Sequence, residues 1–148
     1  MEPVLVSACL AGAPCRYNAR SKASDEVTDL VRRGGAVAVC PEVVGGLGVP
    51  RRPAEIVGGD GDDVLDGRAR VVDDCGNDVT DAFLSGAERA LDLARRAGAK
   101  TAVLTDRSPS CGSREIYDGT FGGTRRPGIG VTAALLARHG IEVRSDSG

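Results

Sequence analysis

The chain contains no tryptophan, and only two tyrosines and two phenylalanines among its 148 residues. A hydrophobic core in such a chain must be built from Val, Leu, Ile and Ala. Glycine is abundant, with 21 residues, which indicates many tight turns. This composition is typical of an α/β protein with elaborate loops, and the length predicts a single domain over residues 1–148.

The sequence also lacks an excess of positive charge and any long apolar stretch. Its formal net charge is −2, whereas nucleic-acid binders usually neutralise several phosphates with clustered Lys and Arg. We therefore expect a small-molecule partner rather than nucleic acid. No apolar run is long enough to span a membrane, and the start lacks a basic region followed by an apolar one. Together these features predict a cytoplasmic protein without a membrane segment.

Short apolar runs and helical periodicity alternate along the chain. Strands are predicted at residues 4–8, 36–39, 101–105 and 141–144, and helices at 24–33, 78–97 and about 127–139. This alternation favours a mostly parallel sheet flanked by helices, with right-handed crossovers.

Asp66 and Gly67, between the apolar segments 64–65 and 69–72, predict a small β-hairpin insertion at the edge of the fold.

Three of the five cysteines follow predicted strands. Cys9 and Cys40 come directly after the first two, and Cys111 lies in the loop after the third. Because ligands of parallel sheets bind at the carboxyl ends of the strands, we expect these thiols to converge. In a reducing compartment, metal binding or catalysis is favoured over disulfides. Three thiolates suit zinc or an iron–sulfur cluster, and they leave one metal position open.

The two remaining cysteines leave alternatives open. Cys15, six residues after Cys9, is either a fourth ligand, which would close the metal site, or a buried neighbour of the ligands. Cys75 lies among polar residues next to the predicted hairpin, and we interpret it as a surface thiol.

Polar groups near the thiols supply candidate proton carriers. Glu42, two residues after Cys40, is either a proton donor and acceptor or an acid in the first turn of a helix. Ser108 before Pro109 predicts an N-cap that places Cys111 in the first turn of a short helix, where unpaired amides lower the pKa of a thiol. The segment 128–130, Gly-Ile-Gly, is a weak candidate for an anion cradle.

Together these motifs resemble a bacterial family whose characterised members are thiouracil desulfurases. The resemblance covers nearly the whole chain, in order, and rests on Ser7-Ala-Cys-Leu10, Cys15-Arg-Tyr17, Cys40-Pro-Glu42, Gly45-Gly-Leu47, Pro50-Arg51, Ser108-Pro-Ser-Cys-Gly112, Ile116-Tyr-Asp-Gly119 and Gly128-Ile-Gly-Val-Thr132.

The resemblance implies a Rossmann-like α/β domain that uses a 4Fe-4S cluster. The family's ligands match Cys9, Cys40 and Cys111, which leave one iron open, and its catalytic residues match Glu42 and Ser108. The implied reaction is the non-redox desulfuration of a thiolated nucleobase or nucleoside such as 2-thiouracil to its oxo form, with release of sulfide. Two alternatives remain: a non-catalytic metal or cluster carrier, and a cluster-free enzyme with Cys111 as nucleophile.

Overall fold

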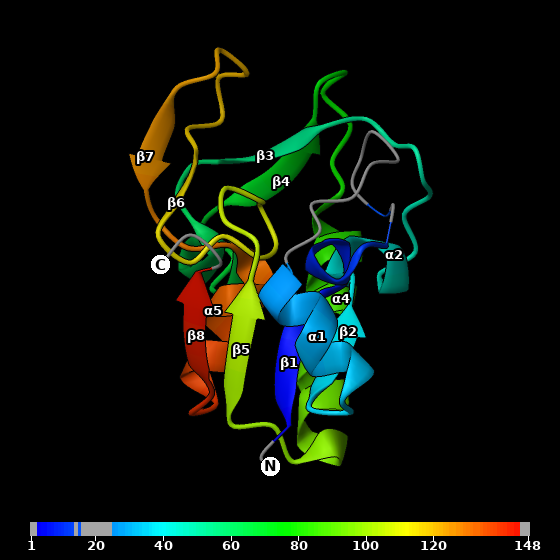
Figure 1. Cartoon of the computed structure of the whole chain (residues 1–148). Helices are drawn as coiled ribbons and strands as arrows, with labels where there is room; N and C mark the ends of the chain where they lie inside the picture. Colours follow the sequence, from blue (N-terminus) through cyan, green and yellow to red (C-terminus); the bar gives the residue numbers. More distant parts are fainter. Residues whose placement is uncertain (1–2, 14, 16–24, 146–148) are drawn as a thin grey trace.

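A four-stranded parallel sheet forms the centre of the computed structural model, which describes residues 3–13, 15 and 25–145. Its strands stand in the order β2-β1-β5-β8 (Figure 1). Their bounds are Val4–Ser7 for β1, Ala36–Val39 for β2, Thr101–Leu104 for β5 and Glu142–Ser145 for β8. All four predicted strands are therefore confirmed. Numbered within this sheet alone, the strand order is 2-1-3-4. This is a doubly wound arrangement, in which successive strands are added to one side of β1 and then, from β5 on, to its other side.

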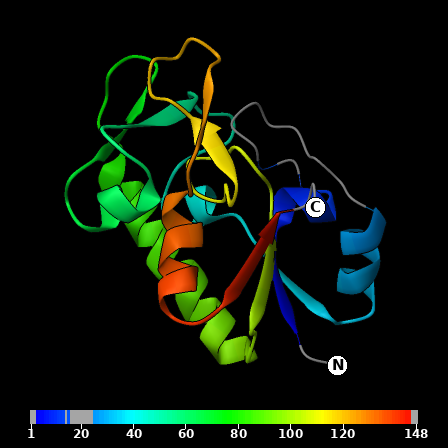
Figure 2. The same cartoon turned by 90° about the vertical axis from the view of Figure 1, so that its left-hand side faces the viewer.

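Helices cover both faces of the sheet. Helix α1, Asp25–Arg32, lies on one face, while α4, Thr80–Ala97, and α5, Val131–Arg138, lie on the other (Figure 2). The three predicted helices are confirmed, and two of them begin later than predicted. Asp78 accepts a hydrogen bond from the amide of Thr80 at the start of α4, and the predicted start of the last helix at about residue 127 is the end of strand β7, Arg125–Pro127, instead. No helix within the described ranges is long and apolar enough to cross a membrane.

The main core lies between the sheet and the pair α4 and α5. Alanines of α4, Ala90 and Ala94, are fully buried and pack with Leu5, Leu104 and Leu136. Burying each leucine stabilises the fold by roughly 1.5–3 kcal/mol. Small residues on α4 let the helix approach closely, which suits a core with almost no aromatic side chains.

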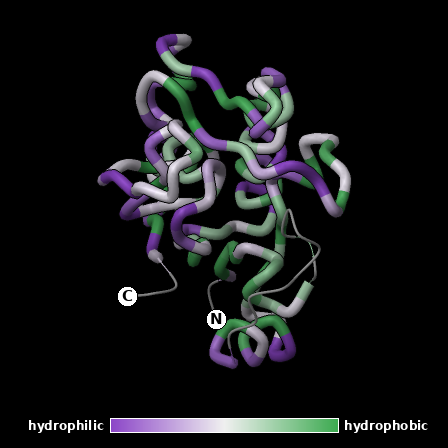
Figure 3. Tube along the Cα trace, turned by 90° about the horizontal axis from the view of Figure 1, so that it is seen from above, coloured by the Kyte–Doolittle hydropathy of each residue, from purple (hydrophilic) through white to green (hydrophobic). Residues whose placement is uncertain are grey.

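Two antiparallel hairpins stand over the carboxyl ends of the parallel strands (Figure 1). The first joins β3, Ala54–Val57, to β4, Arg70–Asp73, and the second joins β6, Glu115–Tyr117, to β7, Arg125–Pro127. Seen from above, this part of the chain alternates between hydrophilic and hydrophobic stretches (Figure 3).

The predicted first strand of the hairpin at residues 64–65 is wrong. These residues end a short helix, α3, Gly61–Leu65, and β4 pairs with β3 instead. The carboxylate of Asp60 accepts hydrogen bonds from the amides of Asp62 and Asp63, and the carboxylate of Asp63 accepts one from the amide of Asp60. This capping box starts a helix, and burial of Val64 completes it.

Several predictions fall on residues outside the described ranges. They are the helix cap at Ser24 and the family-like positions Arg16 and Tyr17. The hairpin of β6 and β7 was not predicted, because its strands have only three residues each and β7 is fully exposed.

Candidate functional site

A pocket of about 700 Å³ lies between the carboxyl end of the sheet and the two hairpins. It is at the point where the strand order reverses, between the loops that follow β1 and β5, which is where doubly wound sheets bind ligands. We call the part lined by Cys9, Cys15, Cys40 and Cys111 the thiol side. We call the part lined by Glu55, Asp74, Tyr117 and Phe121 the hairpin side.

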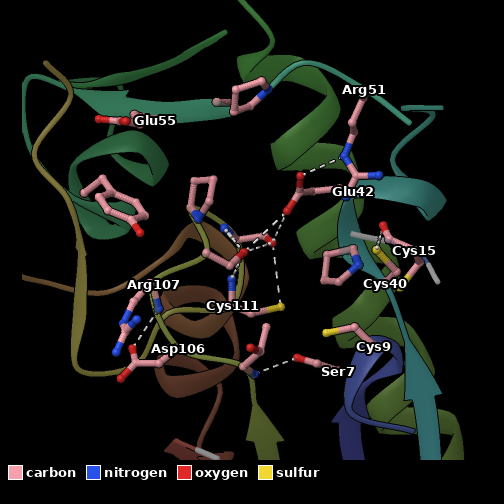
Figure 4. A pocket seen from close by; sticks show the side chains of 18 of the residues that line it. Ser7, Cys9, Cys15, Cys40, Glu42, Arg51, Glu55, Asp106, Arg107 and Cys111 are labelled. Carbon is pink, nitrogen blue, oxygen red and sulfur yellow. Dashed lines mark hydrogen bonds and ion pairs between the residues drawn. The ribbon is translucent and has the colours of Figure 1, made fainter. Parts of the chain in front are cut away.

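The three cysteines that follow strands all line this pocket (Figure 4). Cys9 lies in a short 3-10 helix, Ala8–Ala11, and is 5% exposed, while Cys111 is 3% exposed. Cys40 is the N-cap of the short helix α2, Pro41–Val44, with Pro41 at the first helical position. The structure thus brings together the three thiols that the strand pattern predicted would converge.

Cys111 lies in a single turn, and the short helix predicted there is absent from the structure. The hydroxyl of Ser108 accepts hydrogen bonds from the amides of Ser110 and Cys111, each at 3.1 Å, as an N-cap would. The amide of Gly112 closes the turn on the carbonyl of Ser108 at 2.9 Å. The chain then continues toward β6, so no second helical turn forms.

The start of α5 anchors this turn. The amides of Val131 and Thr132 donate to the carbonyls of Pro109 and Ser110 at 2.8 Å, and the amide of Gly130 donates to Gly112 at 2.7 Å. A side chain at Gly130 would meet the backbone of Ser110 at 2.6 Å, so this contact requires glycine. Of the segment considered for an anion cradle, the amide of Gly130 thus binds the turn that carries Cys111, and the amide of Gly128 donates to the carbonyl of Arg114.

Glu42 lies above the thiols with its carboxylate held from two directions. The hydroxyl of Ser110 donates to Oε2 at 3.0 Å, that of Ser108 donates at 3.4 Å, and Arg51 Nε donates to Oε1 at 3.0 Å (Figure 4). The side chains of Arg51 and Glu42 are only 9% and 15% exposed. Glu42 is thus a fixed acid facing the pocket as well as a residue of the first turn of α2.

Ser110 was not singled out from the sequence, although it contacts three groups of the site. Its hydroxyl lies 2.8 Å from that of Ser108, 3.0 Å from Glu42 and 3.6 Å from the sulfur of Cys111. Ser110 is 1% exposed. The Ser-Pro-Ser-Cys stretch contained this signal, but only the fold shows which serine is nearer to the carboxylate.

The expectation of a lowered pKa for Cys111 is wrong. Burial raises the pKa of this thiol to about 12, and hydrogen bonds from Ser7 and Ser110 oppose the shift without cancelling it. A thiol with so high a pKa is a poor nucleophile near neutral pH. A metal ion can still displace its proton, because ligation deprotonates a coordinating thiol outright.

The two other cysteines lie in different environments. Cys15 lines the pocket, and its carbonyl accepts a hydrogen bond from Cys40 Sγ at 3.8 Å. Burial and the neighbouring Cys40 raise the pKa of Cys15. This position is compatible with a fourth ligand and with a neighbour of the ligands, so both alternatives remain. Cys75 is exposed, as predicted, at the loop after β4, and it does not line the pocket.

The donor set fits an iron–sulfur cluster. Within the described part of the chain, no three His, Cys, Asp or Glu residues are grouped closely enough to hold one metal ion. A cluster spreads its protein ligands over separate irons, so its thiols surround a volume instead of meeting at a point. Cys9, Cys40 and Cys111 line such a volume from three separate segments of the chain, and soft thiolates are the ligands that clusters prefer.

Comparisons with known proteins agree with this site. The family described as 2-thiouracil desulfurase matches residues 4–147. The uncharacterized protein YbbK of Bacillus subtilis (strain 168) is 48% identical over 144 residues, which are 97% of this chain and 95% of that protein. The solved structure of a [4Fe-4S]-dependent thiouracil desulfidase, TudS, has a TM-score of 0.88 and 46% identity, and the match covers 99% of this chain and 92% of that one.

The likeness in fold extends over nearly the whole of both chains, since the match leaves almost no part of either uncovered. The parallel sheet flanked by helices also agrees with the α/β fold that the sequence motifs implied. The chain therefore belongs to the 2-thiouracil desulfurase family.

Proposed function

We propose that this protein is an iron–sulfur-dependent desulfurase that converts a thiolated nucleobase or nucleoside, such as 2-thiouracil, to the oxo form and releases sulfide. The observation that carries the proposal is the meeting of three strand-end thiols with the fixed carboxylate of Glu42 in one pocket. Membership of the family and the likeness to a [4Fe-4S]-dependent thiouracil desulfidase support it.

In this proposal Cys9, Cys40 and Cys111 hold a 4Fe-4S cluster. With three protein thiolates, one iron would have no protein ligand and would supply a thiophilic Lewis acid for the sulfur of the substrate. The burial of Cys9 and Cys111 shields the ligands from water. Because the thiols lose their protons on ligation, assembly of the cluster releases protons.

Glu42 is the proton carrier of the proposed reaction. Its carboxylate takes a proton from the water that attacks the thiocarbonyl carbon, while the sulfur leaves as sulfide. One water is consumed for each sulfide released, so no electron donor or acceptor is needed. Arg51 keeps Glu42 oriented through Oε1, and the hydroxyls of Ser108 and Ser110 fix its second oxygen.

The charge of the pocket supports a neutral substrate. Four carboxylates, from Glu42, Glu55, Asp74 and Asp106, line it against only two guanidinium groups, from Arg51 and Arg107. A phosphate of a nucleotide or nucleic acid would be repelled there, whereas an uncharged base or nucleoside would not.

The five cysteines are thiols without disulfides, which supports a reducing, cytoplasmic location.

One alternative retains a specific observation in its favour. Cys15 lines the pocket next to Cys40, and a fourth thiolate would complete a cluster that only stores or carries iron. The other alternative, a cluster-free enzyme with Cys111 as nucleophile, is disfavoured by the raised pKa of that thiol.

The test is anaerobic reconstitution followed by iron and sulfide analysis and an assay with 2-thiouracil. We expect about four irons and four sulfides per chain, and stoichiometric formation of uracil and sulfide. A protein with a full cluster that desulfurates no thiolated base or nucleoside would favour the carrier. A parent enzyme active without iron would refute the role of the cluster.

A further inference from the structure

The few aromatic residues of this chain are unevenly distributed between the core and the pocket. Of the four in the sequence, Phe83 is buried in the core at 1% exposure. Tyr117, the last residue of β6, and Phe121, in the loop between β6 and β7, both line the hairpin side of the pocket. A core with almost no aromatic side chains thus contrasts with a pocket that has two.

Phe121 has two features that packing does not explain. Its side chain is 37% exposed although it is large and apolar. Its φ of 58° lies in the left-handed region, which is an outlier for a bulky residue. Strained and exposed residues of this kind cluster at ligand sites, where the strain is retained for function.

The loop that presents Phe121 is fixed by hydrogen bonds. Glu55 Oε1, on β3, accepts from the amides of Gly119 at 3.0 Å and Phe121 at 3.2 Å. Asp118 accepts from the amide of Thr120 at 3.0 Å. A side chain at Gly119 would meet the carbonyl of Ile56 at 2.6 Å. The loop is therefore pressed against β3, and the backbone that carries Phe121 is held before any ligand binds.

Glu55 lies across the pocket from Cys9 and Cys40 (Figure 4). A substrate whose sulfur points to the thiol side therefore extends its ring toward the hairpin side. Thiolated pyrimidines are flat rings, and flat rings stack on aromatic side chains.

We propose that Phe121 is the specificity-determining residue on which the ring of the substrate stacks, and that Glu55 is the positioning residue that holds Phe121 in place. This inference rests on the proposed desulfurase function. It limits the substrates to planar thiolated heterocycles and gives the hairpin side a role in recognition that is separate from the chemistry at Glu42.

The first test is Phe121→Ala in the reconstituted enzyme. Stacking of one base on an aromatic residue corresponds to about a 5- to 150-fold change in affinity, so we expect KM for 2-thiouracil to rise within that range while kcat stays within about twofold. Iron content and thermal stability should match the parent. An active parent whose KM is unchanged by Phe121→Ala would overturn the proposal.

Glu55 supplies a second, conservative test. Glu55→Ala frees both amides and should raise KM as Phe121→Ala does, whereas Glu55→Gln keeps an oxygen that can accept from both amides and should restore KM to near the parent value. Equal KM values for the parent and Glu55→Ala, or a Glu55→Gln variant as poor as Glu55→Ala, would refute the positioning role.

A binding measurement separates this inference from the proposed function. Because the chain has no tryptophan, Phe121→Trp introduces a single reporter, and Glu88→Trp, on the exposed face of α4, is the matched control. 2-Thiouracil should quench the tryptophan fluorescence of Phe121→Trp in a saturable way. The quenching should exceed that of Glu88→Trp, which measures only the light absorbed by the ligand. Saturable quenching in cluster-containing Phe121→Trp that shows no turnover would support the stacking site and refute the desulfurase function. Turnover with identical quenching in both variants would refute the stacking site.

Discussion

The thiol side and the hairpin side of the pocket are held by different forces. Cys9 directly follows β1, Cys111 lies in a turn after β5 that is bonded to the start of α5, and both are at most 5% exposed. On the hairpin side Phe121 is 37% exposed, and its loop is held by the carboxylate of Glu55.

The difference shows where precision is needed. Ligands of a cluster must be placed accurately, and strand ends of a buried parallel sheet provide such positions because the whole core resists their displacement. A surface that recognises a flat ring needs only one well-placed face, which a short hydrogen-bonded loop can supply. Changes on the thiol side should therefore abolish the site, and changes on the hairpin side should tune it.

The largest effect is expected from Cys40→Ser. A serine hydroxyl is a poor ligand for a soft metal, so this variant should fail to assemble a complete cluster after anaerobic reconstitution, and Cys9→Ser and Cys111→Ser should do the same. Iron and sulfide analysis with the visible absorption spectrum measures the result. Cys75→Ser, at an exposed position outside the pocket, is the control and should load normally. A fully loaded Cys40→Ser protein would show that the ligand set is different.

The next largest effect is expected from Glu42→Gln. The amide has the size of the carboxylate but cannot take a proton, so turnover should fall by about two to four orders of magnitude, the usual contribution of general acid–base catalysis. The iron content should stay that of the parent. Glu88→Gln, on the exposed face of α4, controls for the loss of one charge. Full activity in Glu42→Gln would show that this carboxylate has no role in proton transfer and is only a charge in the first turn of a helix.

A smaller effect on the same side is expected from Ser110→Ala. The change removes the shorter of the two hydroxyl contacts to Glu42 Oε2, at 3.0 Å. A hydrogen bond to a charged group contributes roughly 1.5–3 kcal/mol, so kcat should fall by about 10-fold or more. Ser85→Ala on α4 is the control. If Ser108→Ala lowers kcat and Ser110→Ala does not, the closer serine is not the one that positions Glu42.

The smallest effect concerns stability at low pH and tests how the hairpin side is held. The side chain of Asn77 and the amides of Cys75 and Asn77 donate to Asp73 at the end of β4, which lowers the pKa of that carboxyl below its ordinary value of 3.8. A lowered folded-state pKa gives stability that is present above about pH 4 and is lost as the pH falls through the folded-state value.

We therefore expect the urea concentration at the unfolding midpoint of the parent to decrease when the pH is lowered from about 6 to about 3. The decrease should be smaller in Asp73→Asn than in the control Asp81→Asn. Hydrogen exchange should increase first in the β3–β4 hairpin and only later in the parallel sheet. Equal pH dependence of the two variants would show that Asp73 does not hold the hairpin side.

Sequence reasoning succeeded where the signal was local and the topology had few choices. Apolar runs at the four parallel strands, three of them followed by a cysteine, predicted both the sheet and the convergence of Cys9, Cys40 and Cys111. It failed at residues 64–65, where the Asp-Gly turn signal competed with the capping box at Asp60, and at Cys111, where burial outweighs the amides expected to lower the thiol pKa.

The sequence by itself determined the α/β pattern, the three strand-end thiols and the family motifs, because each depends on residues close together in the chain or on the fixed edge of a parallel sheet. Only the tertiary structure decided that Ser110 is the closer serine to Glu42, that α5 anchors the Cys111 turn, and that Glu55 holds Phe121 on the pocket wall. Those contacts join residues 18 to 68 positions apart, and no local pattern specifies which distant groups will meet.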